Sequence, residues 1–444
     1  MNKPKIALIS LGCDKNLVES ERMLGSLGGG SYAFSPGEDD ADIIIINTCG
    51  FIRDAADEAK EHIIRALELK ASGPCRWVIV TGCLAQRHKD ALLEEFPEID
   101  GLVTDTSFIK KTVEELTGIE AERGASRILS TPAHYAYLKI AEGCDNACAY
   151  CAIPLIKGPF ASRPMDELLE EAKSLADGGV KELIIIAQDT ALYGKDLYGE
   201  PRIAPLLREL AKIDGIEWLR LMYCYPEHIT GELIDEIAKN PKICHYLDMP
   251  VQHSNGDVLQ RMGRLPARAG TEGSEQGRGM DENGLRDLIG RLRAAIPDIV
   301  LRTTVMAGFP GETKQEFQSM LKFLEDTRFD RLGAFAYSRE EGTPAYDLPG
   351  QLTDKTKTAR RDRVMEQQIS ISQGNLQKNA GKTLRMLVDG WDGIAGVYYG
   401  RSYMDCPEVD GLIYVRTKFG SMEPGTFADV TINETDEYDM FGVL

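Results

Sequence analysis

The chain has 444 residues, of which 43% are hydrophobic and 27% charged, and its formal net charge at pH 7 is −19. This length predicts roughly two to four domains, and the composition is typical of a globular protein. The strong negative charge disfavours binding to a phosphate backbone and favours a basic protein partner. The apolar run Ile6–Ile9 is too short for a signal peptide, and no run approaches the ~20 residues of a membrane span, so we expect a cytoplasmic protein with no membrane partner.

Residues 1–122 alternate between strand-like and helix-like patterns. Strands are expected at Lys5–Ser10, Ile43–Asn47 and Trp77–Thr81, each followed by an amphipathic stretch. This alternation predicts an N-terminal parallel α/β domain. The polar stretch Glu120–Ala133 has the composition of a linker.

Residues 130–372 resume the alternation with six more expected strands. These are Tyr135–Ala141, Glu182–Ala187, Glu217–Tyr223, Tyr246–Met249, Ile299–Thr304 and Arg331–Tyr337. The pattern predicts an open (βα)6 partial barrel with its chemistry at the carboxyl ends of the strands. The segment Gly263–Gly279 is rich in Gly, Arg and Glu and is expected to be a mobile surface loop.

The C-terminal part begins with a long polar helix, expected at Lys355–Lys378. Residues 376–444 then carry short strand-like runs with turn signals between them, which predict a small β-barrel. These runs are Thr383–Val388, Ile394–Tyr399, Leu412–Arg416 and Phe427–Ile432. The fold class expected for the whole chain is therefore α/β with a C-terminal β-barrel.

Three cysteines, Cys144, Cys148 and Cys151, crowd the loop after the first strand of the expected partial barrel. Disulfides are rare in the cytosol, and three close thiolates suit an iron–sulfur cluster with one open iron. An open metal site is typical of catalysis. The alternative is a structural zinc site, for which His134 is the nearest fourth ligand, at the opposite end of the strand.

Cys13, Cys49 and Cys83 are far apart in sequence, but each follows an expected strand of the first domain by two or three residues. The carboxyl ends of parallel strands share one crevice, so the three thiols can converge there. Spacing alone leaves open the alternative of three unrelated buried cysteines. The remaining four cysteines are expected to be buried apolar residues.

Polar residues at the ends of the barrel strands are candidates for cofactor contact. Gln188 and Asp189 fall at one such end, although a turn or helix cap also uses Asp. Gln252, His253 and Arg302 fall at similar places, and Arg302 either pairs with a carboxylate of the cofactor or forms a structural salt bridge.

A glycine-rich turn, Gly308-Phe-Pro-Gly311, has two interpretations. Glycine permits close approach of the backbone to a nucleoside, but most such turns merely reverse the chain.

The stretch from Ala141-Glu-Gly-Cys144 to Tyr150-Cys151-Ala-Ile-Pro154 resembles the signature C-x-x-x-C-x-aromatic-C of the radical S-adenosylmethionine (SAM) superfamily. The resemblance implies a four-iron cluster on the three cysteines, with SAM chelated at the open iron and Tyr150 beside the adenine. The further cofactor contacts expected in the partial barrel rest on positions at strand ends and, for the glycine-rich turn, on the family context. The contacts are Gln188, Asp189, Gln252, Arg302 and Gly308.

The contexts Leu11-Gly-Cys13-Asp-Lys-Asn, Asn47-Thr-Cys49-Gly and Thr81-Gly-Cys83-Leu-Ala-Gln look like the N-terminal domain of methylthiotransferases. That family holds a second four-iron cluster on three such cysteines. The resemblance continues through the barrel and into the tail, which looks like a TRAM domain. Within the family, Leu11–Ser20 and Ala187–Thr190 are most similar to enzymes that modify a small-subunit ribosomal protein. The Gly263–Gly279 segment is longer than the family's turn.

The resemblance implies radical cleavage of SAM, followed by attachment of a methylthio group to the β-carbon of an aspartate in small-subunit ribosomal protein twelve. It also implies an electron donor, whose identity the sequence does not give. A tRNA-adenosine methylthiotransferase and an iron–sulfur electron carrier are the alternatives. The carrier is disfavoured because each three-cysteine set leaves an iron uncapped. Residues 380–444 carry five Lys and Arg against eleven Asp and Glu, so we expect no direct tRNA substrate.

Overall fold

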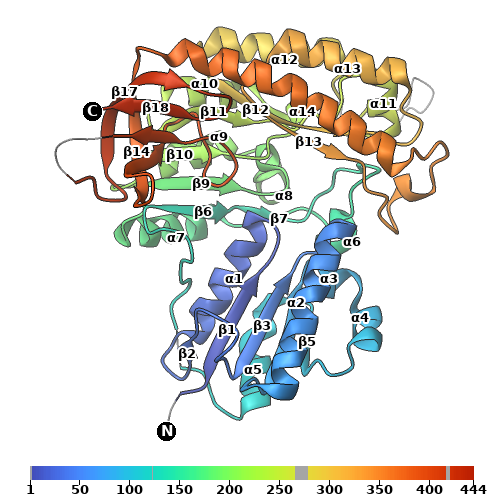
Figure 1. Cartoon of the computed structure of the whole chain (residues 1–444), viewed down its shortest axis with the longest axis vertical. Coiled ribbons are helices and arrows are strands. Elements are labelled where there is room, and N and C mark those ends of the chain that lie inside the picture. Colours follow the sequence, from blue (N-terminus) through green and yellow to red (C-terminus); the bar gives the residue numbers. More distant parts are fainter. Residues whose placement is uncertain (1–2, 123, 266–278, 417–420) are drawn as a thin grey trace. The chain divides into compact units, whose positions relative to one another are not determined.

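The computed structural model describes residues 3–122, 124–265, 279–416 and 421–444 (Figure 1). Most of the expected loop Gly263–Gly279 lies outside these described residues. The chain divides into two compact units. Unit 1 consists of Met1–Thr131, Glu142–Asp145 and Cys151–Phe160, and unit 2 of Pro132–Ala141, Asn146–Tyr150 and Ala161–Leu444.

Unit 1 is a parallel sheet with helices on both faces. Its strands are β1 (Lys5–Ser10), β2 (Ala33–Phe34), β3 (Ile43–Thr48), β4 (Trp77–Gly82) and β5 (Gly101–Val103). Its helices are α1 (Asp14–Leu27), α2 (Arg53–Ser72), α3 (Cys83–Arg87), α4 (Lys89–Glu95), η1 (Thr106–Phe108), α5 (Ile109–Thr117) and α6 (Ile153–Lys157). The sheet order is β2-β1-β3-β4-β5, with every pairing parallel. The predicted parallel α/β fold is confirmed.

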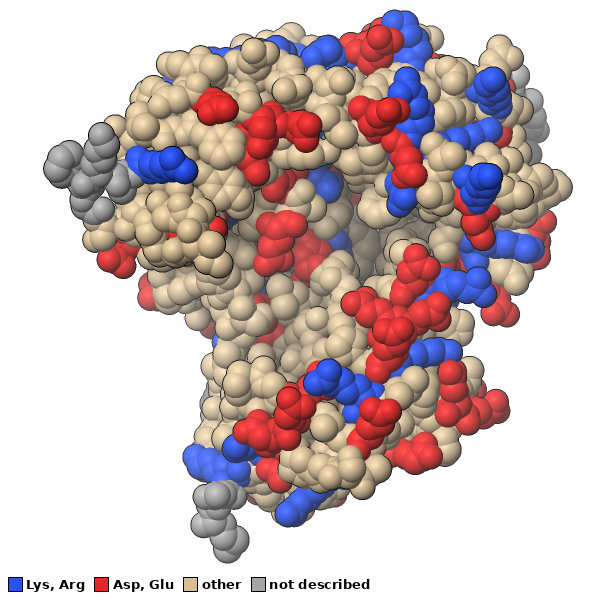
Figure 2. Space-filling view, viewed as in Figure 1, with Lys and Arg blue, Asp and Glu red and all other residues tan. Residues whose placement is uncertain are grey.

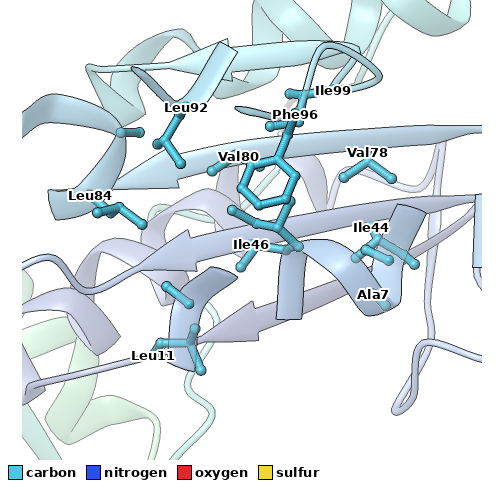
Figure 3. Close-up of a cluster of buried hydrophobic side chains, with 14 of the residues drawn as sticks. Ala7, Leu11, Ile44, Ile46, Val78, Val80, Leu84, Leu92, Phe96 and Ile99 are labelled. Carbon is cyan, nitrogen blue, oxygen red and sulfur yellow. The ribbon is translucent and has the colours of Figure 1, made fainter. Parts of the chain in front are cut away.

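The apolar run of β3 explains why both faces of this sheet are covered. Successive side chains of a strand point to opposite faces, and all of Ile43–Ile46 is fully buried. Ile44 and Ile46 pack with Ala59 and Ile63 of α2, as Figure 3 shows for the two isoleucines and their neighbours in this cluster. The other two isoleucines of the run pack on the opposite face, against α1 and α5. A continuous apolar run is the pattern of a strand buried on both sides.

The expected linker between the domains is irregular, but it is not free. Arg127 Nε donates to Glu21 Oε2 of α1 at 2.8 Å, and Ser130 N donates to Glu21 Oε1 at 2.7 Å. The side chain of Glu21 is completely buried, so the pair satisfies a carboxylate that would otherwise be costly inside unit 1. This stretch therefore covers α1.

Unit 2 contains an open sheet of six parallel strands in the order β13-β12-β11-β10-β9-β6. The strands are β6 (Tyr135–Lys139), β9 (Glu182–Ile186), β10 (Trp218–Leu221), β11 (Ile243–Asp248), β12 (Val300–Ala307) and β13 (Arg331–Ala336). The intervening helices are α7 (Met165–Asp177), η2 (Thr190–Leu192), α8 (Lys195–Tyr198), α9 (Ile203–Leu210), η3 (Pro226–His228), α10 (Gly231–Lys239), α11 (Gly256–Arg261), α12 (Glu282–Ala295) and α13 (Lys314–Thr327). Two-residue strands β7 (Ala141–Glu142) and β8 (Ala161–Ser162) also occur. This is the predicted partial barrel.

The C-terminal part begins with η4 (Pro344–Asp347), α14 (Asp354–Leu376) and η5 (Gln377–Asn379). A closed barrel follows in the order β14-β15-β16-β18-β17. Its strands are β14 (Thr383–Asp392), β15 (Val397–Arg401), β16 (Ile413–Val415), β17 (Phe427–Thr435) and β18 (Met440–Val443). Four of these strands were expected, and the short β18, which pairs with both β16 and β17, closes the barrel.

Within unit 2, buried ion pairs fasten this barrel to the sheet. Glu182 of β9 accepts from Arg220 Nε of β10 at 2.7 Å and from Arg401 Nη1 of β15 at 2.6 Å. All three side chains are at most 1% exposed. Buried charges of this kind are tolerated only when they are fully paired, which fixes how the barrel and sheet meet. Among the described residues, no helix is both long enough and apolar enough to cross a membrane.

Candidate functional site

In unit 1, three cysteines follow the carboxyl ends of neighbouring parallel strands: Cys49 and Cys83 come directly after β3 and β4, and Cys13 comes three residues after β1. Cys13 precedes α1, Cys49 follows β3 and Cys83 begins α3. None of the three forms a disulfide. Parallel register places these strand ends at one edge of the sheet, which is the edge where such folds bind ligands.

Two glycines let these strand ends approach closely. Gly12 has φ +89°, and a Cβ there would lie 2.7 Å from Cys49 Cβ and 2.9 Å from Cys49 Sγ. Gly82 has φ +92°, and a Cβ there would lie 2.4 Å from the carbonyl oxygen of Thr48. Positive φ and missing space both require glycine at these positions. The glycine before each of Cys13 and Cys83 is thus part of the site.

A network of buried amides connects the same strand ends. Asn16 Nδ2 donates to the carbonyl oxygens of Leu11 at 2.6 Å and of Asn47 at 3.2 Å. In return, Asn47 Nδ2 donates to the carbonyl oxygen of Asn16 and to Ser20 Oγ, both at 2.9 Å. The network joins the start of α1 to the ends of β1 and β3, and it holds the Cys13 loop against β3. The sequence analysis did not assign this role to Asn16 and Asn47.

The three thiols lie close enough to affect one another electrostatically. The pKa of the Cys83 thiol is raised to about 12, chiefly by burial; Lys157 acts to lower it, and the neighbouring Cys13 and Cys49 contribute to raising it. Burial also raises the pKa of Cys49, with a contribution from Cys13. Nearby thiols resist ionisation because each thiolate repels the next. A cationic metal centre removes this penalty, since it stabilises the thiolate form of its ligands. The donor set of three soft sulfurs therefore fits an iron–sulfur cluster.

Helix α6 brings the chain just after Cys151 against this site. Ala152 and Ile156 pack with Cys83 in one apolar cluster, all within unit 1. Lys157, at the end of α6, forms an ion pair with Glu142 at 3.6 Å. Burial alone would lower the pKa of Lys157, but Glu142 and Cys83 raise it overall. A cation that remains charged here partly offsets the negative charge of nearby thiolates, and the sequence analysis missed it.

Cys144, Cys148 and Cys151 lie in the loop between β7 and α6 and are free of disulfides. Their donor set also fits an iron–sulfur cluster by the softness of its sulfurs. His134, the candidate fourth ligand of the zinc alternative, instead hydrogen-bonds Asp389 at 2.8 Å. In the described part of the chain, no three Cys, His, Asp or Glu side chains are spaced to hold a single metal ion.

Asp189 connects the loop that carries Cys144, Cys148 and Cys151 to the six-stranded sheet of unit 2. Its carboxylate is fully buried, accepts from Asn146 Nδ2 at 3.1 Å and lies 2.6 Å from His228 Nδ1. Asn146 lies between Cys144 and Cys148, so Asp189 fixes the loop that carries the thiols. Its observed contacts are those of a residue that positions the loop.

Of the other residues expected near the cofactor, Gln188 and His253 have a buried polar atom without a partner in the described part of the chain, whereas Arg302 and Gly308 contact other parts of the protein. Gln188 Oε1 and His253 Nε2 are buried without a hydrogen-bond partner among the described residues. Gln252 has φ +64°, and its backbone bridges to β12 through Thr304 and Met306. Burial lowers the pKa of His253 to about 3, so its imidazole is neutral near pH 7. Unpaired buried polar atoms are rare in proteins, and those of Gln188 and His253 are therefore available to a ligand.

Arg302 and Gly308 have structural partners. Arg302 forms ion pairs with Asp248 at 2.9 Å and with Asp410 of the C-terminal barrel at 3.5 Å, which is the salt bridge that the sequence left as an alternative. At Gly308, which has φ +79°, a Cβ would lie 2.5 Å from Lys357 Cγ of α14. The close backbone approach at this turn is therefore to a helix of the protein itself.

Tyr150 and Tyr225 flank the cysteine loop within unit 2. Tyr150 packs at the edge of an apolar cluster that contains Ala149, Met262 and Phe309. The Tyr225 hydroxyl lies 2.5 Å from Cys148 Sγ. The sequence analysis missed Tyr225, although its position just after β10, at a strand's carboxyl end, was a usable signal.

Family comparisons identify the class of the protein. The model of the radical SAM superfamily matches residues 138–324, that of the uncharacterised family UPF0004 matches residues 5–104, and that of the TRAM domain matches residues 380–444. Among solved structures, the radical SAM methyltransferase TsrM from Kitasatospora setae gives a TM-score of 0.55 at 14% identity, covering 88% of this chain and 79% of that one. The same protein with cobalamin and a [4Fe-4S] cluster bound gives 0.54 at 15% identity, over 78% and 77%. These structural matches support the fold, and the superfamily match defines a radical SAM enzyme.

Curated relatives identify the family. Proteins named ribosomal protein uS12 methylthiotransferase RimO are 46% identical in Lachnoclostridium phytofermentans, over 99% of both chains, and 46% identical in Pelotomaculum thermopropionicum, over 99% of this chain and 98% of that one. The relative of that name in Clostridioides difficile is 45% identical, also over 99% and 98%. The chain therefore belongs to the RimO family of methylthiotransferases. It is a transferase, and its class implies SAM and [4Fe–4S] clusters as cofactors.

Proposed function

We propose that this chain adds a methylthio group to the β-carbon of an aspartate in ribosomal protein uS12. The observation that carries the proposal is the identity of 42–46% to curated relatives named ribosomal protein uS12 methylthiotransferase, over at least 98% of this chain. Such coverage includes both cysteine sites and the C-terminal barrel. A ribosomal protein substrate also implies that the enzyme works in the cytoplasm.

The proposal places one four-iron cluster on Cys144, Cys148 and Cys151, and the second on Cys13, Cys49 and Cys83. When bound, these groups supply the electron that cleaves SAM to methionine and a 5′-deoxyadenosyl radical, and the sulfur that joins the substrate carbon. The protein's own residues bind and orient the reactants. In this proposal Tyr150 would lie beside the adenine, and Gln188 Oε1 and His253 Nε2, which have no hydrogen-bond partner among the described residues, would be available to SAM.

The substrate preference is supported by the surface charge of the C-terminal barrel. Asp389, Asp405, Asp410 and Asp439 are among those of its eleven acids that hold partners inside the protein, so fewer acids face outward than the sequence count implied. The other seven are at least partly exposed. Only Lys382, Arg385 and Arg416 are exposed bases among the described residues of the barrel. Over the viewed face of the molecule, acidic and basic side chains are interspersed (Figure 2).

A groove of about 680 Å³ on this barrel combines apolar and acidic side chains. Tyr414 and Phe441 stack in its lining with ring centroids 5.6 Å apart, and Asp392, Glu434 and Arg416 supply its charges. Aromatic surface with a net negative charge suits a basic protein segment better than a phosphate backbone. We place part of the uS12 contact here.

The test is mass spectrometry of purified uS12 and of isopentenylated tRNA after turnover by anaerobically reconstituted enzyme. We expect a methylthio group on the protein and none on the tRNA, and the reverse result would overturn the proposal.

The double variant Asp392→Lys, Glu434→Lys should raise the KM for uS12 severalfold, because it reverses the charge of the groove. Formation of 5′-deoxyadenosine without substrate should be unchanged. The matched control is Asp90→Lys, Glu94→Lys on α4, which reverses two exposed acids of unit 1 and should leave KM unchanged. Equal effects of the two double variants would remove the groove from the proposal.

A further inference from the structure

Tyr225 is a side chain outside the cysteine loop that contacts one of the loop's thiols, that of Cys148. Its hydroxyl lies 2.5 Å from Cys148 Sγ, within unit 2. Either atom could donate in the free protein. A cysteine that binds iron has lost its proton, so with a cluster on Cys148 the phenol is the donor and the thiolate sulfur the acceptor.

The ring of Tyr225 is held from two directions. His228 stacks on it at a centroid distance of 5.8 Å and an interplanar angle of 26°, and the Arg264 guanidinium lies 4.1 Å from its centroid. Both neighbours are themselves fixed, His228 by Asp189 at 2.6 Å and Arg264 by Glu227 at 3.3 Å. The hydroxyl is therefore held in one place by its neighbours.

The backbone that carries Tyr225 is also constrained. Tyr223 adopts φ +58°, a conformation that non-glycine residues rarely hold without support. Its N–H donates to Asp248 Oδ2 at 3.1 Å, and its carbonyl accepts from Thr190 N at 3.0 Å. Strain of this kind persists where the surrounding structure fixes the chain, and here it directs the next turn toward Cys148.

We propose that Tyr225 is a positioning residue for the cluster on Cys144, Cys148 and Cys151, here called the barrel cluster. By donating a hydrogen bond to the Cys148 thiolate, Tyr225 raises the reduction potential of this cluster. A reduced cluster carries one more negative charge than an oxidised one, so a donor to its sulfur stabilises the reduced form more. The cluster that must deliver an electron to SAM is thereby easier to reduce. The inference rests on the proposed cluster on Cys144, Cys148 and Cys151, and is independent of which substrate the enzyme modifies.

The test is a redox titration of full-length, anaerobically reconstituted enzyme, monitored by electron paramagnetic resonance. The barrel cluster is recognised as the one whose signal changes when SAM is added. Tyr225→Phe keeps the ring between His228 and Arg264 and removes only the hydroxyl, so the midpoint potential of this cluster should become more negative. The matched control is Tyr193→Phe in the same unit, whose hydroxyl donates to the carbonyl oxygen of Arg163 at 2.9 Å; it should leave the potential unchanged.

A second variant should shift the midpoint potential in the opposite direction. Replacing Tyr225 by 3-fluorotyrosine makes the phenol a stronger donor, so the potential should rise, whereas a purely structural role would give no rise. An unchanged potential in Tyr225→Phe, or a shift in the same direction for both substitutions, overturns the proposal. If the phenylalanine variant loses its cluster, the fluorotyrosine variant decides alone. A wild-type enzyme with no SAM-sensitive signal would instead overturn the cluster placement itself, and with it this inference.

Discussion

The two cysteine sites achieve the same chemistry of three soft sulfurs by different means. Cys144, Cys148 and Cys151 fall within one loop, so the covalent chain itself keeps them together. Cys13, Cys49 and Cys83 come from three separate strand ends, and only the register of β1, β3 and β4 brings them to one edge. Both sites use close backbone packing at a glycine, Gly143 in the loop and Gly12 in the sheet site, but the loop is in addition oriented by side chains from other strand ends, such as Asp189.

The two sites should therefore be sensitive to different substitutions. Around the loop, side chains such as Asp189 and Tyr225 add to close backbone packing at Gly143, where a Cβ would lie 2.0 Å from the carbonyl oxygen of Pro159. Around the sheet site, the supporting contacts are close packing at glycines such as Gly12 and hydrogen bonds from side-chain amides such as Asn16 to backbone carbonyl oxygens. Substitutions of these supports should therefore affect one cluster and spare the other.

The largest loss of cluster content and activity is expected when a predicted cluster ligand is replaced by alanine. Cys148→Ala should remove one of two clusters and abolish formation of 5′-deoxyadenosine. Cys49→Ala should remove the other cluster, retain 5′-deoxyadenosine formation and abolish methylthiolation. Iron and sulfide analysis with product assays measures both, and Cys75→Ala and Cys244→Ala, at buried cysteines elsewhere, are the controls. A wild-type content of one cluster, or of stoichiometric zinc, would contradict the assignment.

Asp189→Ala should lower 5′-deoxyadenosine formation about 10- to 100-fold, the range seen when outer partners of metal ligands are removed. The reason is that Asn146 and His228 lose their shared buried partner and the loop is no longer held. The N-terminal cluster should be retained. Asp196→Ala, an exposed carboxylate that accepts from Ser162 N at 2.8 Å, is the control and should change little.

Gly12→Ala should reduce the occupancy of the N-terminal cluster while sparing the barrel cluster. Positive φ costs a non-glycine residue about 1–3 kcal/mol, and the new Cβ would collide with Cys49. Gly37→Ala, in the same unit with open space around it, is the control. Iron content per chain, measured with Cys148→Ala as background, reports the N-terminal site alone. Full occupancy in Gly12→Ala would show that the strand ends can move apart without loss of the cluster.

Glu182→Gln should destabilise unit 2 by about 3 kcal/mol at pH 7, because Arg220 and Arg401 lose a buried counter-charge. Burial raises the pKa of Glu182, but the two arginines lower it overall, below the usual value of 4.5. A carboxyl whose pKa is lowered by folding stabilises the folded state at pH values above its pKa in the unfolded chain. That contribution is lost as the pH falls through its pKa in the folded protein. The difference from wild type in unfolding free energy should therefore hold at neutral pH and shrink in acid below about pH 4.5.

The control for this measurement is Glu217→Gln. Glu217 pairs with Arg385 at 2.9 Å, but both side chains are more than 40% exposed. An exposed pair contributes about 0–1 kcal/mol, so this variant should differ little from wild type at any pH. A pH-independent loss in Glu182→Gln would mean that the charge of Glu182 is not what stabilises the contact.

Much of the site could be predicted because its signals are local. Strand β1 and the starts of β3, β4 and β9 lie where the apolar runs predicted them, because buried parallel strands need continuous apolar sequence. Cysteines placed just after such runs could be assigned to strand ends without knowledge of the fold. The strands β2, β5 and β18 were missed because two to four residues carry no measurable periodicity.

Periodicity and turn signals in the amino-acid sequence were enough to predict the parallel α/β units and the C-terminal barrel, which the structure confirms. The spacing of six cysteines also predicted two cluster sites, and that assignment stays a prediction. The partners of the polar side chains depend instead on the tertiary structure. Arg302 pairs with Asp248 and Asp410, Asp189 holds Asn146, and Tyr225 reaches Cys148. Each of these contacts joins residues dozens of positions apart, and a buried charge or hydroxyl takes whichever partner the packing brings within hydrogen-bond distance. No local pattern specifies that choice, because it depends on how the strands and loops meet.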